Sequence, residues 1–230
     1  MGRGWKESLP LGLRKSVKAR RAATFEAVGS LRYSAPALSA LDIRMAGRLP
    51  DSGVFLEIGA NDGYSQSNTY FLERARNWTG ILIEPSPALF ERCRRTRPSA
   101  YCVRAACVGA AASGDVVDLV DLDLQSVTLG QQPNAEEARR LAQPGGRKYS
   151  VPATTLSAVI DASPYSGIDF MSIDVEGAEL SVLSGLDLPR HCPTWLLVET
   201  AYPDDVFALL TPHAVLFEQM TGHDYLFKRA

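Results

Sequence analysis

From residue 54 onward, short apolar runs alternate with segments of helical spacing, and this alternation most constrains the fold. The runs are VFLEIG (54–59), ILIE (81–84), YCVRAACV (101–108), DFMSID (169–174) and TWLLVE (194–199). Apolar runs this short and continuous are typical of strands that are buried on both faces of a parallel sheet. The order therefore predicts an α/β fold: a doubly wound, mostly parallel sheet with helices on both faces.

Helix signals fall between these runs. The segment 67–76 (SNTYFLERAR) has apolar residues at helical spacing, and Ser86 stands where an N-cap precedes a helix that starts with Pro87. Further helices are predicted at about 153–162, 178–185 and 204–210. The last two apolar segments, 214–220 and 225–229, are predicted to close one edge of the sheet as antiparallel strands.

Between the third and fourth runs this order stops, and residues 110–152 are interpreted as an insertion at the mouth of the sheet. DVVDLVDLD (115–123) alternates apolar and acidic residues, which predicts a half-exposed strand. AEEARRLA (135–142) predicts a short helix or an ordered loop. We expect the insertion to lie over the functional site, because it interrupts the α/β order beside the strand ends.

The N-terminal residues differ from the rest in charge. Residues 1–32 hold eight lysines and arginines against two acids, a net charge of +6, whereas the remaining chain carries −8. We interpret this arm as a solvated helix that packs on its own domain or on a second copy of the chain; an anionic surface is the alternative. Nucleic acid is not expected, because no nucleic-acid motif is present. The predicted division is a basic helical arm over 1–50 and one α/β domain over 51–230.

Composition bears on the compartment. No stretch approaches about eighteen uninterrupted apolar residues, so no membrane span is predicted. The N-terminus lacks the apolar core of a secretory signal. The cysteines show no CxxC spacing and are interpreted as reduced thiols: Cys93, Cys102, Cys107 and Cys192. Together these features predict a cytoplasmic protein.

The first strand leads into a turn that suits a ligand held against bare backbone. Gly59 and Gly63 bracket the sequence GANDG, and Asn61 between them tolerates left-handed backbone geometry. Glu57, just before the turn, would repel a pyrophosphate and attract an ammonium group, so we expect a ligand with an amine. This acid and the missing third glycine argue against a nicotinamide dinucleotide.

Glu84 ends the second strand, 21 residues after Gly63. An acid at this distance accepts hydrogen bonds from the two hydroxyls of an adenosine ribose. The alternative is a helix-start carboxylate beside Pro85. An acid for an amine and an acid for a ribose together describe S-adenosylmethionine.

With these residues the chain resembles the FkbM-type, Rossmann-like methyltransferases. The resemblance rests on FLEIGANDGYSQSNTYFLE, GILIEPSPALFE, DFMSIDVEGAELSVLSGL and WLLVET, which occur in the family's order over roughly residues 53–200. IDVEGAE is the most specific of these segments. The resemblance implies a class I methyltransferase domain over 51–230 that methylates a hydroxyl of a sugar or natural product, with S-adenosylmethionine as the cofactor.

The same resemblance places the cofactor along the ends of the first, second, third and fourth predicted strands. The residues expected to contact it are Glu57, Gly59, Ala60, Asn61, Gly63, Tyr64, Ser65, Glu84, Pro85, Ala105, Ala106 and Asp174. Main chain and the small apolar walls of Ala105 and Ala106 are expected to hold the adenine, since no Asp or Asn is available there.

Acids at the ends of the fourth and fifth strands suit methyl transfer to a hydroxyl. This in-line displacement needs alignment and removal of the hydroxyl proton. Asp174 is predicted to be the general base, and Glu199 to join it in catalysis. Glu176 and Glu179 are predicted to bind a polar acceptor, or else they are acids favoured by the start of a helix.

Two alternatives concern this chemistry. Asp174 and Glu199 are alternatively ligands of Mg²⁺, which prefers carboxylate oxygens. Related metal-dependent sugar methyltransferases tend to carry two adjacent acids at this strand end, and Thr200 in the second position argues against a metal. His223, in the turn between the last strands, is an alternative base.

Two other classes of function remain for the chain as a whole. A non-catalytic Rossmann-like module predicts a degenerate cofactor pocket, and the intact acids and glycines of the first two strand ends argue against it. A nicotinamide-dependent oxidoreductase is the other alternative. The acceptor is expected to be a small hydroxylated molecule, and the arm is a candidate contact between copies of the chain.

Overall fold

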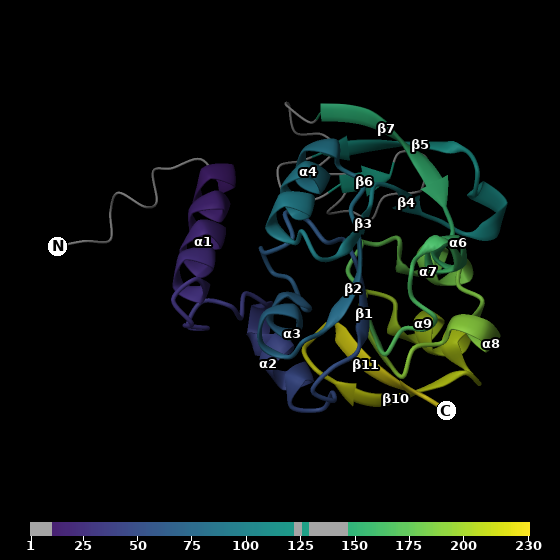
Figure 1. Ribbon diagram of the computed structural model, residues 1–230. Coiled ribbons are helices and arrows are strands. Elements are labelled where there is room, and N and C mark those ends of the chain that lie inside the picture. The colour runs from purple at the N-terminus through teal and green to yellow at the C-terminus, as the bar shows by residue number, and fades with distance from the viewer. Residues whose placement is uncertain (1–10, 122–125, 129–146) are drawn as a thin grey trace.

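The computed structural model describes residues 11–121, 126–128 and 147–230. The strands of the main sheet are β1 (Val54–Ile58), β2 (Thr79–Ile83), β3 (Tyr101–Val103), β8 (Phe170–Ile173), β9 (Trp195–Glu199), β10 (Ala214–Gln219) and β11 (Asp224–Arg229). They lie in the order β10-β11-β9-β8-β1-β2-β3 (Figure 1). β3, β2, β1, β8 and β9 run parallel, and β11 pairs antiparallel with both β9 and β10. The predicted mostly parallel sheet with an antiparallel closing strand is confirmed.

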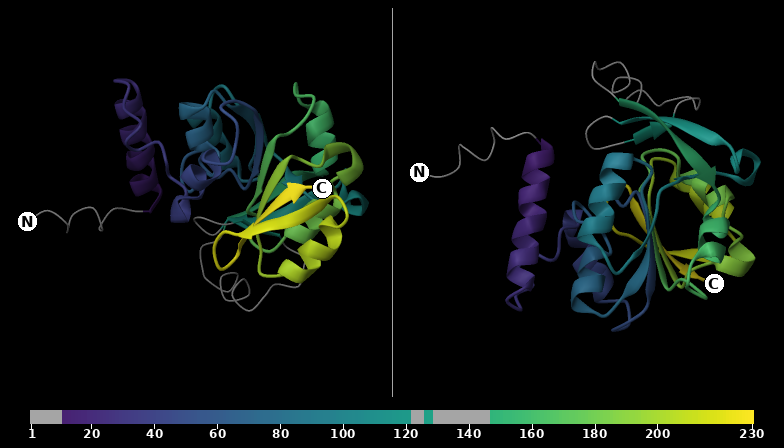
Figure 2. Two further views of the ribbon diagram at one scale, coloured as in Figure 1. Left: turned by 90° about the horizontal axis from the view of Figure 1, so that it is seen from below. Right: turned by 45° about the horizontal axis from the view of Figure 1, so that its top comes forward.

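Helices cover both faces of this sheet, as Figure 2 shows in two views. One face carries α2 (Leu41–Ala46), α3 (Tyr70–Ala75) and α4 (Pro87–Thr96). The other carries α6 (Leu156–Ala162), α7 (Glu179–Ser184), α8 (Leu188–His191) and α9 (Pro203–Leu210). The predicted start of α4 is confirmed, because the Ser86 hydroxyl accepts from the Leu89 backbone N–H at 3.5 Å.

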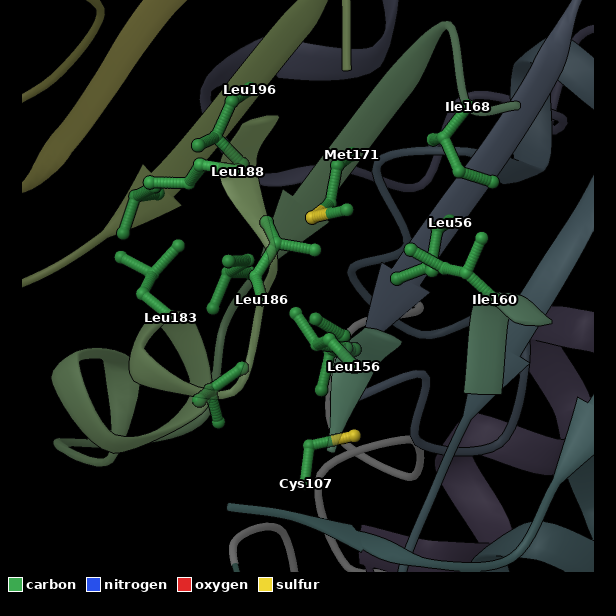
Figure 3. Packing of buried hydrophobic residues seen from close by; sticks show 14 of the residues in the cluster. Leu56, Cys107, Leu156, Ile160, Ile168, Met171, Leu183, Leu186, Leu188 and Leu196 are labelled. Carbon is green, nitrogen blue, oxygen red and sulfur yellow. The ribbon is translucent and has the colours of Figure 1, made fainter. Parts of the chain in front are cut away.

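Two apolar cores result, because successive side chains of a strand point to opposite faces. Leu56 and Met171, from β1 and β8, lie with Leu156 and Leu183 from α6 and α7 (Figure 3). Phe55 and its neighbours face α2, α3 and α4 instead. Complete burial of one such side chain stabilises the fold by about 1.5–3 kcal/mol, so both faces hold the sheet in place.

A second, smaller sheet lies beside the first, with strands in the order β4-β7-β5-β6. Its strands are β4 (Ala106–Cys107), β5 (Val116–Asp121), β6 (Ser126–Thr128) and β7 (Arg147–Thr154). The half-exposed strand predicted at 115–123 is confirmed as β5 as far as Asp121, and its last two residues lie outside the described residues. The strand β7 was not predicted. The segment 135–142 lies outside the described residues.

The run at 101–108 is not one strand, which corrects the prediction. β3 pairs with β2 in the main sheet, and β4 pairs with β7 in the small one. Arg104, which separates them, is exposed. The predicted helix at 153–162 also begins later, because Thr155 is its N-cap and accepts from the Ala158 N–H at 3.1 Å.

The basic arm contains the helix α1 (Leu11–Glu26), which lies beside α3 and α4 (Figure 1). Ala22 is buried against Tyr64 and Tyr70. The Glu26 carboxylate accepts hydrogen bonds from Ser34 Oγ at 2.6 Å and from the Tyr70 hydroxyl at 3.1 Å. The C-terminal end of α1 therefore packs on the α/β domain. None of the helices in the described part of the chain has the length and hydropathy of a membrane span.

The topology opens a crevice between β1 and β8. The chain leaves β1 toward α3 on one face of the sheet, whereas it leaves β8 toward α7 on the other. Ligands of doubly wound sheets bind at such a point, beyond the carboxyl ends of the strands.

Candidate active site

A cavity that is open to solvent lies at this crevice. Its place beyond the strand ends, at the switch point of the sheet, is where small-molecule sites occur in such folds. Ten of the residues predicted from the sequence line it: Glu57, Gly59, Asn61, Ser65, Glu84, Pro85, Ala105, Ala106, Asp174 and Glu176. The wall does not include Ala60, Gly63, Tyr64, Glu179 and Glu199. The structure thus brings the ends of β1, β2, β3 and β8 together around one space.

The turn after β1 requires its glycines. Gly59 and Gly63 both have φ +81°, and Asn61 has φ 52°, in the left-handed region. A Cβ on Gly59 would overlap the carbonyl oxygen of Asp174, and one on Gly63 would lie 3.1 Å from Cys93 Cα. Backbone geometry and close packing therefore both select glycine.

Asp62 fixes the next part of the turn and was not predicted. Its Oδ1 accepts from the backbone N–H groups of Tyr64 and Ser65 at 3.1 and 2.7 Å, and its Oδ2 accepts from Ser65 Oγ at 2.9 Å. Tyr64 points away from the cavity, and its hydroxyl donates to the carbonyl oxygen of Tyr33 at 2.8 Å. Of the two residues after Gly63, only Ser65 lies in the cavity wall.

Glu57 organises the loop before α3. Its buried carboxylate accepts from Ser67 Oγ at 2.8 Å, from the Asn68 N–H at 2.8 Å and from Thr69 Oγ1 at 2.5 Å. Two of these donors share Oε2, so Oε1 retains capacity for a further donor. The side chain therefore holds the loop and still presents negative charge at the cavity.

A buried arginine supports the same loop from behind. Arg97, at the end of α4, pairs with Glu73 Oε2 at 2.6 Å and donates to Thr69 Oγ1 at 3.2 Å and to Ser67 Oγ at 3.4 Å. Its side chain is fully buried. Hydroxyls that accept from a cation and donate to a carboxylate link both charges in one network. The position of the loop thus depends on α3 and α4 as well as on β1.

Glu84 faces the turn from the end of β2. Its Oε2 accepts from the Asn61 N–H at 2.8 Å and its Oε1 from the Ser86 N–H at 2.8 Å. The residue is only 4% exposed, yet it lines the cavity. It therefore ties the glycine turn to the start of α4.

Small and apolar side chains form the wall next to Glu84. Ala105 and Ala106 lie where the chain crosses from β3 to β4, and both are buried. Pro85 lies beside them in the wall, and Leu119 contributes from β5. This part of the cavity suits a flat apolar group between main chain and aliphatic side chains.

Asp174 provides the acidic end of the cavity. Burial is the main cause that raises its pKa well above the ordinary value, and the nearby Glu199 and Glu176 add to the effect. The pKa of Glu199 is also raised, by burial and then by Asp224, although His223 opposes the shift. The His223 Nε2 lies 3.5 Å from Glu199 Oε1. A carboxylate with a raised pKa is a better proton acceptor than an exposed one.

Glu179 has a different environment from Glu176. It is 3% exposed, and its Oε1 accepts from the Gly177 N–H at 2.8 Å. Burial raises its pKa to about 6. Glu176 lines the cavity with φ 54°, next to Gly177 at φ 100°. The helical spacing predicted that the two acids share one face toward the cavity, and this prediction is wrong. The helix α7 begins only at Glu179, so Glu176 lies before it.

The described part of the chain contains no group of three or more His, Cys, Asp or Glu residues placed to hold a metal ion. Asp174 and Glu199 are two acids, and the Thr200 side chain accepts from the Tyr202 N–H at 3.0 Å. Thr200 therefore stands where metal-dependent sugar methyltransferases tend to carry a second acid, and Asp174 and Glu199 remain two acids without a third.

Some residues of the wall were missed. They are Ile58, Gln66, Ser67, Asn68, Leu89, Cys107, Leu119, Val175, Ala178 and Val182. The polar run SQSNT after the glycine turn pointed to part of this set, since small polar groups before a helix often bond to nearby backbone. Leu119 belongs to the insertion 110–152 that was expected over the site, and the other apolar members carry no signal of this kind.

Comparison with known proteins identifies relatives. The sequence model of the methyltransferase FkbM domain matches residues 57–226. No curated protein matches the chain in a sequence search. The solved methyltransferase FkbM from Methylobacillus flagellatus KT is similar, with a TM-score of 0.50 and 14% identity, over 93% of this chain and 57% of that one. The chain thus spans little more than half of that relative.

Two further solved structures show weaker similarity. A TehB-like SAM-dependent methyltransferase from Corynebacterium glutamicum ATCC 13032 Kitasato has a TM-score of 0.46 and 10% identity, over 95% of this chain and 100% of that one. An O-methyltransferase from Bacillus cereus in complex with SAH has a TM-score of 0.46 and 12% identity, over 92% and 89%.

Proposed function

Because this chain belongs to the FkbM methyltransferase family, we propose that it transfers a methyl group from S-adenosylmethionine to a hydroxyl of a sugar or natural-product acceptor. The observation that carries the proposal is that Glu57, Glu84 and Asp174 line one cavity. These acids suit an ammonium group, a ribose and a hydroxyl proton, which are the polar groups of this cofactor and acceptor.

The residues of the cavity fit S-adenosylmethionine. Gly59 leaves the backbone bare where the turn meets Asp174, and Ala105 and Ala106 offer a thin apolar wall for an adenine. Glu84 would accept from the ribose hydroxyls, since its carboxylate lies in the cavity wall at the end of β2. When bound, the cofactor supplies an electrophilic methyl group on a positively charged sulfur.

The chain's own contribution to the reaction is alignment and proton removal. Asp174, in its ionised form, would accept the proton of the acceptor hydroxyl at the cavity wall. Burial and the neighbouring acids raise its pKa, which strengthens it as a base. Glu199 would orient the hydroxyl or stabilise the protonated form of Asp174.

The acceptor is proposed to enter from the side of the insertion. Leu119 of β5 lies in the cavity wall, which supports a role for residues 110–152 in covering the site. We further propose that residues 51–230 form the methyltransferase domain and that 1–50 form an accessory arm. The arm would dock on this domain, since Ala22 packs against Tyr64 and Tyr70, and Leu41 and Met45 of α2 belong to the core cluster of Phe55.

Calorimetry tests the cofactor. The full chain is titrated with S-adenosylhomocysteine and, separately, with NAD. We expect binding of the first and none of the second, because a pyrophosphate would meet the carboxylates of Glu57 and Glu84. Binding of NAD without binding of S-adenosylhomocysteine would contradict the proposal and favour an oxidoreductase.

Glu84→Ala should weaken S-adenosylhomocysteine by roughly tenfold to over a hundredfold, because hydrogen bonds to a charged acceptor contribute about 1.5–3 kcal/mol. The measurement is calorimetric affinity. Glu84→Gln is the companion variant, since it keeps the size and one acceptor and should lose less. Glu91→Ala, at an acid on the neighbouring helix α4 that forms an ion pair with Arg94, is the control. Equal affinity of the wild type and Glu84→Ala would remove Glu84 from the site.

A further inference from the structure

Asn68, on the loop before α3, is a residue of the cavity wall with one unsatisfied group. It is 9% exposed. Its backbone N–H donates to Glu57 Oε1 at 2.8 Å, and its Nδ2 donates to Ser172 Oγ at 3.0 Å. Among the described residues, its buried amide oxygen Oδ1 has no hydrogen-bond partner. The backbone N–H and the Nδ2 group of Asn68 thus hold the residue in place, and its Oδ1 atom remains as an acceptor without a donor.

This oxygen differs from the other buried side-chain atoms without a hydrogen bond. Those are Glu73 Oε1, Arg74 Nε and His191 Nε2. Each has an oppositely charged or ionisable neighbour: Glu73 Oε1 lies 3.6 Å from Arg74 Nη1, Arg74 Nε lies 3.5 Å from Glu26 Oε2, and His191 Nε2 lies 3.2 Å from Asp161 Oδ1. Asn68 Oδ1 has no such ion pair within the described residues. A buried acceptor left in this way requires an explanation.

The groups around Asn68 Oδ1 indicate which kind of ligand atom would bind to it. Asn68 Oδ1 is an acceptor, and Glu57 Oε1, to which the same residue is bonded, also has room for a donor. A ligand carboxylate would be repelled by Glu57, whereas an ammonium group offers three donors and a positive charge. Asn68 and Glu57 both line the cavity, so an ammonium group bound there lies beside both side chains.

We propose that Asn68 is a binding residue for the ammonium group of S-adenosylmethionine, with Oδ1 as the acceptor beside the Glu57 carboxylate. This inference rests on the proposed function. It makes Asn68 a residue that selects ligands with an amine, in contrast to Glu84, which faces the ribose.

The test compares S-adenosylhomocysteine with two analogues, one without the amino group and one without the carboxylate, by calorimetry on the full chain. In Asn68→Ala, we expect S-adenosylhomocysteine and the analogue without the carboxylate to bind about tenfold to a hundredfold more weakly. The analogue without the amino group should bind as it does to the wild type. Ser172→Ala is the control, because it removes the partner of Nδ2 and leaves Oδ1; all three affinities should then keep their ratios.

Several results would overturn the proposal. Equal losses for all three ligands would make Asn68 a support of the loop only. A loss that disappears for the analogue without the carboxylate would assign Nδ2, not Oδ1, to the ligand. If Asn68→Ala does not fold, Asn68→Asp decides: it keeps an acceptor, so S-adenosylhomocysteine should still be preferred over the analogue without the amino group. Loss of that preference contradicts the inference. Failure of the wild type to bind S-adenosylhomocysteine at all would instead reject the proposed function.

Discussion

Replacing Asp174 by asparagine should lower turnover by about 10²–10⁴-fold, the range that a positioned general base contributes, while the affinity for S-adenosylhomocysteine is unchanged. The asparagine keeps the size of the side chain at the cavity wall and cannot accept the hydroxyl proton. Turnover is measured as methyl transfer to an identified acceptor, and affinity is measured by calorimetry. A fully active Asp174→Asn enzyme would reject Asp174 as the base and direct attention to His223.

The alternative in which Asp174 and Glu199 hold Mg²⁺ makes a different prediction. Dialysis against EDTA would then abolish wild-type activity, Mg²⁺ would restore it, and Glu199→Gln would match Asp174→Asn, because each change empties the same cation site. We expect EDTA to have less effect than the substitution of Asp174. Loss of activity in EDTA with full rescue by Mg²⁺ would reverse this expectation.

The pH dependence of the same reaction also tests whether Asp174 acts as a general base. Burial and neighbouring acids raise the pKa of Asp174, and the ionised form is the base. Turnover should therefore rise with pH, with a midpoint above the value of about 3.9 for an exposed aspartate. Glu199→Gln removes one of the negative charges that raise the pKa, so the midpoint should move to lower pH. An unchanged midpoint in Glu199→Gln would show that the charge of Glu199 does not affect the pKa of the base.

Gly59→Val should abolish measurable binding of S-adenosylhomocysteine. The new Cβ would overlap the carbonyl oxygen of Asp174, and φ +81° is a conformation that a β-branched residue avoids. The backbone of the turn or of β8 must then shift, which displaces both the turn and the acid that line the cavity. Calorimetry measures the affinity, and urea unfolding measures the remaining stability.

Gly29→Val is the matched control for this change. Gly29 has φ +78°, and within the described residues no neighbouring atom lies within 4 Å of the position that a Cβ would take. The substitution therefore brings the cost of the left-handed conformation, of order 1–3 kcal/mol, without the overlap. It should bind S-adenosylhomocysteine normally. Normal binding by Gly59→Val would show that the turn lies elsewhere when ligand is bound.

The central strands could be predicted because each is a continuous apolar run that must be buried on both faces. The helix α4 could be predicted from Ser86 and Pro87, which mark its start in the sequence itself. β7 could not, since Pro152 interrupts the segment and proline normally argues against a paired strand. In the structure Pro152 pairs with Val116, the first residue of β5. Whether proline is accepted in this strand therefore depends on a pairing partner more than thirty residues away in the sequence.

The lining of the cavity was predicted where topology alone decides it. Glu57, Glu84 and Asp174 end neighbouring parallel strands, so any doubly wound sheet brings them to one edge. Asn68 and Arg97 were missed, because their roles depend on which donor meets which acceptor after folding. In ERCRRTRP, Arg97 is one of several basic residues, and nothing in its spacing shows that it alone is fully buried.

The pairing of Arg97 with Glu73 has a consequence for inheritance. Loss of Glu73 leaves the Arg97 charge fully buried without this counterion, which is costly. Loss of Arg97 removes the 2.6 Å partner of Glu73 and disturbs the hydroxyls that reach Glu57. In evolution the two residues can therefore be replaced only together, or through an intermediate protein with lower stability. Positions 73 and 97 are expected to covary across distant homologues, although neither side chain lies in the cavity wall.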